Sequence, residues 1–434
     1  MNLFEWTLKI NGFPLKEARA KLKSIQAIPT PAYPAHLEGQ KQELLQFHFK
    51  HNPCYRNLLG GSMPQDWSKV PIMTKADLQQ PLADRLSDGY TKKNCYINKT
   101  SGSSGHPFVF AKDKFCHALT WARVMGLYKG LGIDMGRSLE ARFYGIPLEF
   151  PGKQKELLKD SLSARVRFPI FDLSDAVLEG YLDRFKKRSF VSINGYTSSI
   201  LLFAKYVHKK GVVLKEVCPS LSCVIVTSEM LFDMDRELME QAFGVPIINE
   251  YGASELGVIA HSDESGLLVL NTETLYVEVV DDHGIPVTDG QEGRIVITGL
   301  YNKAHPMIRY EIGDIGVMGT TAEGRPALTQ LLGRTNDVAR LPNGKVIPGL
   351  TFYYVTKSII EDGSDVREFT VEQLGPTHFK VVYAAGSMLS EAMKEKVIEA
   401  LNRYVGNNLM IDFEHVRFIQ RSKSGKLKQF ISRI

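Results

Sequence analysis

The chain of 434 residues is 44% hydrophobic and 23% charged, and 53 basic against 48 acidic side chains give it a formal net charge of +5. These values are ordinary for a globular protein of more than one domain, and the positive excess is too small to predict nucleic-acid binding. No stretch predicts a membrane-spanning helix, Glu5 and Lys9 interrupt the apolar core that a secretory signal requires, and five cysteines without paired spacing predict a reducing, cytoplasmic location.

The first part of the chain predicts helices, and the middle predicts alternating strands and helices. Residues 1–95 are mostly helical in pattern, with a proline-rich interruption at "IPTPAYPAH". Further on, "SDAVLEGYLDRFKKR" starts with the capping residue Ser174 and carries an apolar stripe, and "FDMDRELMEQAFG" ends at Gly244, a typical C-cap. The apolar strands "FVSINGY", "CVIVTSE" and "VPIINEY" alternate with these helices along the chain. This alternation predicts a parallel sheet covered by helices.

After about residue 270 the pattern becomes antiparallel. "LYVEVVD" and "GRIVITGL" are separated by a turn-rich segment, and near the end "REFTVEQL" and "HFKVVYAAG" predict a hairpin beside a helix that starts after Ser390 and a closing strand "MIDFEHVRFI". We therefore predict an α/β protein with two domains. A large multi-subdomain N-terminal domain at 1–333 has helix-covered sheets and a β-rich subdomain, and a small mobile α+β domain occupies 334–434.

Two pairs of possible metal ligands are predicted to be structural instead. Cys218 and Cys223 in "CPSLSC" are expected as buried thiols entering a strand, and His48 and His51 in "FHFKH" are expected on the surface, because neither pair has further ligands nearby.

The turn "TSGSSGHP" is rich in glycine and hydroxyl groups. Glycines let successive backbone N–H groups converge on an anion, and hydroxyls add donors, so the loop suits a polyphosphate. No Gly-Lys-Ser/Thr follows, so it is not a Walker loop. Taken alone, the composition favours a flexible surface turn over a phosphate site, because short clusters of glycine and serine are common in loops.

The segment "NEYGASELG" directly follows an apolar strand. It places Tyr251 and Glu255 at a strand's carboxyl end, where open α/β sheets bind ligands, and a carboxylate there can hold Mg²⁺ against phosphate. The alternatives are a half-buried core aromatic for Tyr251 and a solvated helix start for Glu255.

Three later residues are further candidates. Asp314 in "RYEIGD" is either a turn residue or an acceptor for two vicinal hydroxyls, and Arg334 in "GRTND" is either a surface charge or a phosphate or ribose ligand. The basic tail "RSKSGKLKQFISR" is either solvated or, through Lys426 beside a glycine, a source of an ammonium group for a cleft.

The order of these motifs carries more weight than any one of them. The series "TSGSSGHP", "TSE", "NEYGASE", "RYEIGD", "GRTND" and "SGKLKQFISR" resembles the adenylate-forming enzymes, the group of acyl-CoA synthetases, luciferases and peptide-synthetase adenylation domains. "FKHNPCYRNLL", "VPIMTKADL" and "NGYTSSI" resemble the phenylacetate–CoA ligase branch and its relatives linked to capsular-polysaccharide biosynthesis. The resemblance covers essentially the whole chain.

The resemblance implies a role for each matching residue. The loop from Thr100 to Gly105, which we call the phosphate loop, would hold the β- and γ-phosphates of ATP. Tyr251 would stack on the adenine, and Glu255 would ligate Mg²⁺ and be catalytic. Asp314 would accept the ribose hydroxyls beside Arg334, and the catalytic Lys426 would bridge the carboxylate and the α-phosphate. The other implied nucleotide-binding residues are Thr100, Ser101, Gly102, Ser103, Ser104 and Gly105 in the loop, and Ser228, Glu229, Glu250, Gly252, Ala253 and Ser254 around the adenine.

The implied activity is that of an ATP-dependent, AMP-forming ligase that activates a small carboxylic acid and transfers the acyl group to coenzyme A. An amine or the thiol of an acyl carrier protein is the alternative acceptor, and a degenerate nucleotide-binding protein is the alternative of another class. We expect a monomer or homodimer without nucleic acid as a partner and without membrane insertion.

Three departures from the family pattern bear on these expectations. His106 stands where the loop commonly has lysine, and Asn336 stands where the hinge commonly has aspartate. The segment "EARFYGIPLEFPGKQKELLKD" lacks the glycine-rich aromatic motif of phenylacetate ligases, so phenylacetate itself is not the expected acid.

Overall fold

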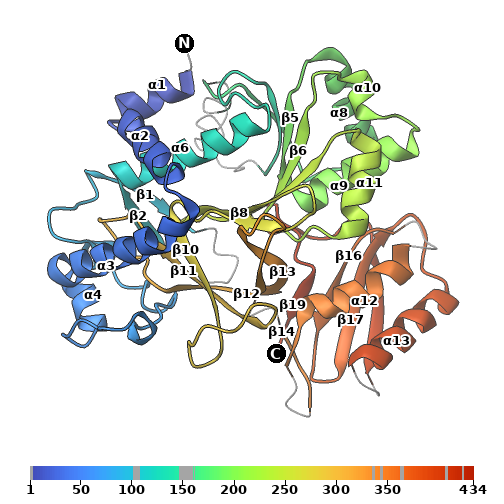
Figure 1. Cartoon of the computed structure of the whole chain (residues 1–434). Coiled ribbons are helices and arrows are strands. Elements are labelled where there is room, and N and C mark those ends of the chain that lie inside the picture. The colour runs from blue at the N-terminus through green and yellow to red at the C-terminus, as the bar shows by residue number, and fades with distance from the viewer. Residues whose placement is uncertain are drawn as a thin grey trace. The chain divides into compact units, whose positions relative to one another are not determined.

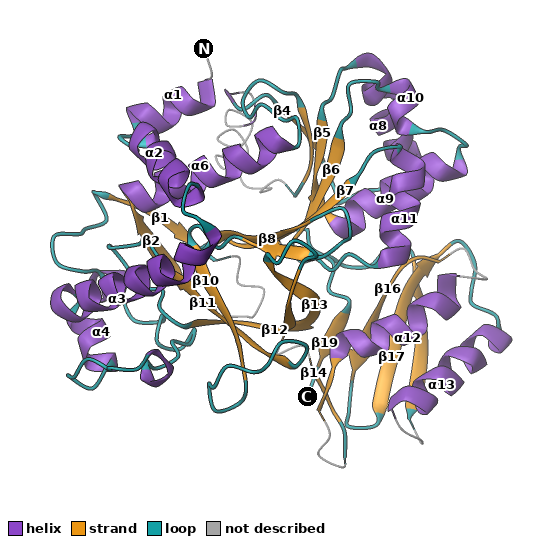
Figure 2. Cartoon of the chain, viewed as in Figure 1, coloured by secondary structure: helices purple, strands orange, loops and turns teal. Residues whose placement is uncertain are grey.

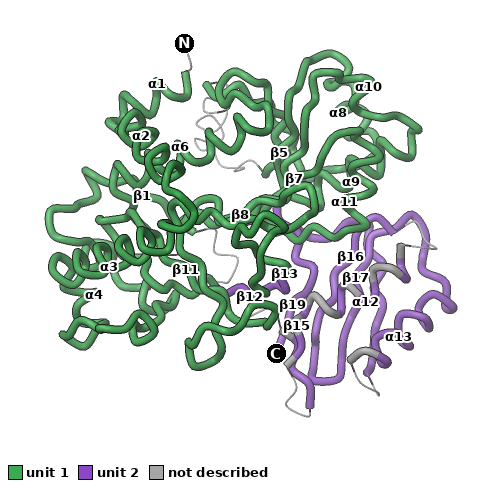
Figure 3. The backbone as a smooth tube through the Cα atoms, viewed as in Figure 1, with its two compact units in different colours: residues 1–312, 316–330 green, residues 313–315, 331–434 purple. Residues whose placement is uncertain are grey.

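A computed structural model describes most of the chain (Figure 1). The described residues are 3–100, 108–145, 160, 162–334, 338–342, 346–361, 366–405, 409–422 and 425–434. They form two compact units, residues 1–312 with 316–330 and residues 313–315 with 331–434 (Figure 3). Within the described residues, no helix has the length and apolar character to cross a membrane. The predicted boundary at residues 333 and 334 and the mobility of the smaller domain stay predictions.

The first unit begins with the predicted helical region. Apolar side chains of α2 (Leu15–Gln26) and of α6 (Lys114–Gly130) pack into one core, which includes Ala18, Leu22 and Ala122. The helices are α1 (Leu3–Ile10), α2 (Leu15–Gln26), α3 (Tyr33–His51), α4 (Pro53–Leu58) and α5 (Leu82–Arg85), with short 3-10 turns at Thr30–Ala32 and Trp67–Lys69.

An 11-stranded sheet forms the centre of this unit, in the order β10-β11-β12-β13-β9-β8-β7-β6-β5-β3-β4 (Figure 2). One part is parallel, as predicted: β4 (Arg165–Phe168), β3 (Glu140–Phe143), β5 (Ser192–Tyr196), β6 (Cys223–Thr227) and β7 (Ile247–Ala253). Helices α8 (Asp175–Lys187), α9 (Thr197–Lys209), α10 (Leu214–Val217) and α11 (Asp233–Phe243) contribute to one core on this sheet, and α6 contributes to another.

Side-chain alternation along the strands explains the two cores. In β6 the residues Val224 and Val226 join the core with α8, α9 and α11, whereas Cys223 and Ile225 join the core with α6. The buried parallel strands are therefore apolar on both faces, which produced the continuous apolar runs in the sequence.

The remaining strands of the sheet are β8 (Gly257–Ser262), β9 (Leu268–Leu270), β10 (Leu275–Val280), β11 (Glu292–Gly299), β12 (Tyr310–Thr320) and β13 (Pro326–Arg334). The predicted antiparallel pair is confirmed, because β10 and β11 pair from Leu275 opposite Gly299 onward. A separate antiparallel ribbon pairs β1 (Cys95–Lys99) with β2 (Val109–Asp113), the strands that precede and follow the predicted phosphate loop in the chain.

The second unit has a four-stranded sheet in the order β18-β17-β16-β19. Its elements are β14 (Val338–Arg340), β15 (Val346–Pro348), α12 (Gly349–Glu361), β16 (Val366–Gln373), β17 (His378–Ala385), α13 (Glu391–Val405), β18 (Met410–Val416) and β19 (Phe430–Ser432). The predicted hairpin of β16 and β17 is confirmed. The prediction that β18 closes the unit is wrong, because the tail adds β19, which pairs parallel to β16 and buries Phe430.

The prediction of a surface His48 is also wrong. Its ring is fully buried, with Nδ1 3.1 Å from the Ser87 hydroxyl and Nε2 2.9 Å from the Asn302 carbonyl oxygen, and burial lowers its pKa to about 4. Cys218 and Cys223 are buried and free, as predicted, and no cluster of three metal-ligating side chains occurs in the described part of the chain.

Two helix N-caps behave differently, which gives a first prediction. Asn52 is buried and accepts a hydrogen bond from the Tyr55 N–H at 2.8 Å, while its amide donates to the Arg85 carbonyl at 2.9 Å. Ser174 occupies the N-cap position of α8 but makes no side-chain capping bond. We expect Asn52→Ala to lower the free energy of unfolding by about 1–3 kcal/mol, because it removes a cap and leaves a buried carbonyl unpaired.

Urea denaturation of the two variants measures this difference. Ser174→Ala is the matched control and is expected to change the free energy of unfolding by less than about 0.5 kcal/mol. Equal losses in the two variants would contradict the assignment of a capping role to Asn52.

Candidate active site

The adenine-binding prediction falls at the carboxyl ends of two adjacent parallel strands. Thr227 is the last residue of β6, and its hydroxyl donates to the Glu250 backbone carbonyl of β7 at 2.8 Å. Ser228 follows with φ of +70°, a left-handed conformation that turns the chain sharply out of the sheet. Glu250 of β7 pairs with Thr227, so the segment that follows Glu250 starts beside the turn at Ser228.

Glu229 has a structural partner that the sequence did not reveal. Its Oε2 accepts from the Ser198 N–H at 2.8 Å, and its backbone carbonyl accepts from the Thr197 hydroxyl at 3.2 Å. These groups lie in the first turn of α9, so Glu229 satisfies an N–H that a helix start leaves unpaired. Its carboxylate holds α9 against the carboxyl end of β6.

Glu255 lies in a tight turn between β7 and β8. A side chain at Gly252 would place its Cβ 2.9 Å from the Gly257 carbonyl oxygen, and Gly257 itself has φ of +91°, so both positions require glycine. The turn buries the Glu255 side chain, and the Tyr310 hydroxyl donates to its Oε1 at 3.1 Å. The alternative of a solvated helix start is therefore wrong. Ser254, next to it, is exposed.

The base of the predicted phosphate loop lies beside Tyr310, the residue that bonds the Glu255 carboxylate. The Thr100 N–H donates to the Phe108 carbonyl at 3.0 Å, and the Phe108 N–H donates to the Thr100 hydroxyl at 3.1 Å, which closes the loop at its two ends. The Phe108 ring lies edge-on to Tyr310, with 6.1 Å between the centroids. Residues 101–107, which include Ser101–Gly105 and His106, lie outside the described residues.

Lys112 is a residue near this carboxylate that we did not predict. It lies on β2, is buried, and its Nζ is 3.5 Å from the Thr120 hydroxyl. Burial lowers the pKa of Lys112, and the negative charge of Glu255 partly offsets that effect. A lysine within an apolar strand, in "FVFAK", was the available signal.

Three predicted residues belong to the second unit. Asp314 is buried on β12 after Gly313, whose φ is +89°, and Arg334 is the last residue of β13. Lys426 follows Gly425, whose φ is +86°, in a turn that the Ser422 side chain closes by accepting from the Lys426 N–H at 3.0 Å. The turn at Gly425 expected from the sequence is therefore present. Asn336 lies outside the described residues.

The buried Glu255 carboxylate suits a magnesium ion that is also bound by phosphate oxygens. Mg²⁺ commonly takes one or two carboxylates together with phosphate oxygens and water, so the single buried Glu255 carboxylate would be a sufficient protein ligand if the predicted loop binds phosphates. Tyr310 hydrogen-bonds only one of the two carboxylate oxygens in the described contacts, and it orients the group.

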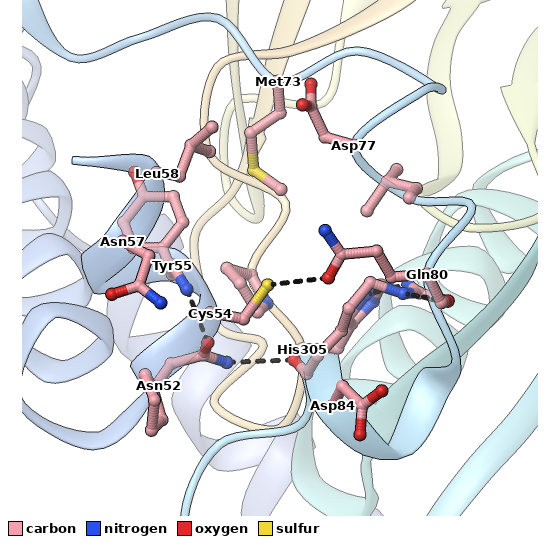
Figure 4. Close-up of a pocket in the computed structure, with 14 residues that line it drawn as sticks. Asn52, Cys54, Tyr55, Asn57, Leu58, Met73, Asp77, Gln80, Asp84 and His305 are labelled. Atoms are coloured by element: carbon pink, nitrogen blue, oxygen red, sulfur yellow. Dashed lines mark hydrogen bonds between the residues drawn. The ribbon is translucent and has the colours of Figure 1, made fainter. Parts of the chain in front are cut away.

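A cavity of about 420 Å³ lies elsewhere in the first unit (Figure 4). Asn52, Cys54, Tyr55 and Gln80 are among its lining residues, and the Cys54 thiol points across it toward Gln80, with Sγ 3.6 Å from Oε1. None of the sequence-predicted site residues lines this cavity.

Several known proteins are similar to this chain in sequence. No family model matches the chain. Protein CapK of Staphylococcus aureus is 22% identical over 380 residues, which cover 85% of this chain and 80% of that protein. Phenylacetate-coenzyme A ligase of Thermus thermophilus is 23% identical over 407 residues, which cover 89% of this chain and 86% of the relative.

A solved structure defines the class of fold. 2-Hydroxyisobutyryl-CoA ligase, in its postadenylation state with R3-HIB-AMP, superposes with a TM-score of 0.70 at 18% identity, over 93% of this chain and 90% of that one. The fold is that of the adenylate-forming CoA ligases. In sequence the chain is similar to CapK and to phenylacetate–CoA ligases, and in fold it is similar to an adenylate-forming CoA ligase.

Proposed function

We propose that the protein is an ATP-dependent, AMP-forming ligase that converts a small carboxylic acid to its acyl adenylate and transfers the acyl group to coenzyme A. One observation carries the proposal. The closed base of the Thr100 loop, the Tyr310 hydroxyl and the buried Glu255 carboxylate form one contact chain beside the carboxyl ends of parallel strands. The family relationship supports the same activity.

The reaction needs two displacements. A carboxylate oxygen of the acid attacks the α-phosphorus of ATP, the new P–O bond forms, and the bond to pyrophosphate breaks. The thiol of coenzyme A, on losing its proton, then attacks the acyl carbon, a C–S bond forms, and AMP leaves with the C–O bond electrons. The first product is a mixed anhydride, which makes a poor electrophile reactive.

In this proposal the residues of the chain position the nucleotide. The Thr100 loop holds the β- and γ-phosphates, and Tyr251 and the turn at Ser228 border the adenine. Asp314 accepts the ribose hydroxyls, with Arg334 beside it. Positioning of this kind supplies much of the barrier reduction in phosphoryl and acyl transfer.

Two further groups stabilise charge in the proposed reaction. Glu255 would hold Mg²⁺, which neutralises charge on the departing phosphates when it is bound. The Lys426 ammonium stabilises the negative charge that builds on the α-phosphate oxygens during the first displacement. We propose that residues 334–434 act as a mobile domain that brings Lys426 to the nucleotide for this step and withdraws it for thioester formation.

The exchange of labelled pyrophosphate into ATP tests the proposal directly. A panel of aryl, alkyl and amino acids is expected to contain at least one acid that supports exchange and that yields a hydroxamate with hydroxylamine. Coenzyme A should then release AMP and form a thioester. Amines and a carrier-protein thiol, offered in parallel, test the other acceptors. Absence of exchange with every acid would overturn the proposal.

A further inference from the structure

A buried polar network joins helix α6 to strands β5 and β7. The Tyr128 hydroxyl on α6 donates to Oε2 of Glu250 at 3.1 Å, and the Asn194 amide donates to the Tyr128 oxygen at 3.2 Å. Tyr144, just after β3, donates to the Asn194 amide oxygen at 2.8 Å. These bonds satisfy the neighbours of Glu250 but leave its Oε1 without a hydrogen-bond partner among the described residues.

The members of this network differ in burial. Tyr128, Asn194 and Tyr196 are buried, whereas Glu250 and Tyr144 keep part of their surface exposed. Burial nevertheless raises the pKa of Glu250 to about 7, because the surrounding protein removes much of the water that would hydrate its charge. A carboxyl group that is both desolvated and accessible is well placed to contact a small molecule.

The position of Glu250 relates it to the acid substrate. It directly precedes Tyr251 on β7, and the ends of β5, β6 and β7 form the edge of the sheet where α/β proteins bind ligands. Because the acid must bond to the α-phosphorus, the acid and the nucleotide occupy adjoining regions. Ile248 and Glu250 both face α6, the side of the sheet away from the core with α9.

The charges around Glu250 define what it can recognise. Tyr128 and Tyr144 are neutral donors that the network already uses, and Arg142 pairs with Glu140 at 3.0 Å while its guanidinium lies over the Tyr144 ring at 4.3 Å. Arg142 is thus engaged, and the accessible group is an acidic acceptor. A second carboxylate at this point would be repelled, whereas an O–H or N–H donor would complete the bonding of Glu250.

We propose, on the basis of the function proposed above, that Glu250 is a specificity-determining residue and that the acid carries a hydroxyl or ammonium group away from its reacting carboxylate. If the acid presents only a hydrocarbon group to Glu250, the desolvated Oε1 of Glu250 stays without a hydrogen-bond partner. A site built to bond a substrate donor discriminates against an analogue without one, because the protein group then loses both water and partner.

Pyrophosphate exchange with matched pairs of acids tests this inference. Suitable pairs are 4-hydroxyphenylacetate with 4-methoxyphenylacetate, 3-hydroxybutyrate with butyrate, and 6-aminohexanoate with hexanoate. For at least one pair we expect kcat/KM to be about tenfold or more higher for the donor-bearing acid in the unmodified protein. Glu250→Gln should bring that ratio close to one for an ammonium-bearing acid and lower it severalfold for a hydroxyl-bearing acid.

Two further variants separate recognition from a general effect on the fold. Glu273→Gln removes a carboxylate that pairs with Arg123 at 3.2 Å, outside the network, and should leave the ratio unchanged. Tyr128→Phe keeps the Glu250 carboxylate but removes the hydroxyl that positions it, so the ratio should fall without being lost. Both readouts are ratios between two acids on one protein, so a partial loss of folded protein does not alter them.

The pH dependence adds an independent readout. Below a pH of about 7 Glu250 is protonated and Oε1 can itself donate, and above that pH it is ionised and only accepts. For a donor-bearing acid, kcat/KM should therefore rise between pH 6 and pH 8, and Glu250→Gln should remove that rise. In Tyr128→Phe the rise should move to higher pH, because the Tyr128 hydrogen bond lowers the pKa of Glu250.

The outcomes are distinguishable. Exchange that is supported equally by both members of every pair, or a ratio that Glu250→Gln leaves intact, would overturn the role of Glu250 while leaving the ligase function standing. Absence of exchange with every acid would overturn the ligase function and this inference with it.

Discussion

Lys426→Ala is expected to reduce pyrophosphate exchange by about 10²–10³-fold, the cost of removing one preplaced group that stabilises developing transition-state charge. The loss should appear in kcat, because the ammonium stabilises the charge that develops on the α-phosphate oxygens more than it binds either ground-state substrate.

The second displacement, thioester formation, should be retained in this variant. When the acyl adenylate is supplied directly, the variant should still transfer the acyl group to coenzyme A at a rate within a few-fold of the unmodified protein, because in the proposed mechanism Lys426 serves only adenylation.

Lys428→Ala is the matched control, because it removes the same charge from the same tail at an exposed position. It should leave exchange within about twofold, since exposed surface substitutions rarely alter function or stability. If both variants lost exchange equally, the tail would act through its overall charge. If Lys426→Ala slowed both displacements equally, a role confined to adenylation would be wrong.

The alternation of apolar strands with amphipathic helices was enough to predict an α/β fold with a parallel core, and the reason is physical. Apolar runs such as "CVIVTSE" mark strands that helices cover on both faces, and Gly244, predicted as a helix C-cap, has φ of +68°. These signals are local. The missing β19 shows their limit, because Phe430–Ser432 is a strand only through its pairing with β16, and the lysines that precede it resemble a solvated tail.

The candidate site was predictable as a set of residues but not as a set of contacts. Glu255 could be placed after a strand, but its burial depends on Tyr310, which is 55 residues away in the chain. Glu250 is one member of "NEYGASE" in the sequence, and its contact with the Tyr128 hydroxyl joins residues 122 positions apart. Glu229 likewise caps a helix that starts 32 residues earlier. Interactions over such separations are decided by tertiary packing, which residue spacing does not encode.

Glu255→Gln is the second prediction with a large expected effect. The amide keeps the size of the side chain and can still accept from the Tyr310 hydroxyl, but it lacks the charge that a magnesium ion requires of a ligand. We expect pyrophosphate exchange at a fixed, moderate Mg²⁺ concentration to fall by about 100-fold. Raising the Mg²⁺ concentration should recover part of the loss, so a titration of exchange rate against Mg²⁺ should shift to higher concentration.

Two comparisons make this result specific to the metal. Glu264→Gln changes an exposed carboxylate in the turn between β8 and β9 and should leave the Mg²⁺ titration unchanged. Tyr310→Phe removes the hydrogen bond but keeps the charge, so it should slow exchange by only about tenfold, as loss of a group that orients a metal ligand does.

Glu255 also offsets the cost of burying the Lys112 ammonium, so urea denaturation should show a less stable Glu255→Gln protein. Exchange must therefore be measured under conditions in which this variant is folded. A variant that is folded, slow and indifferent to Mg²⁺ concentration would show that Glu255 acts on Lys112 and not on a metal ion.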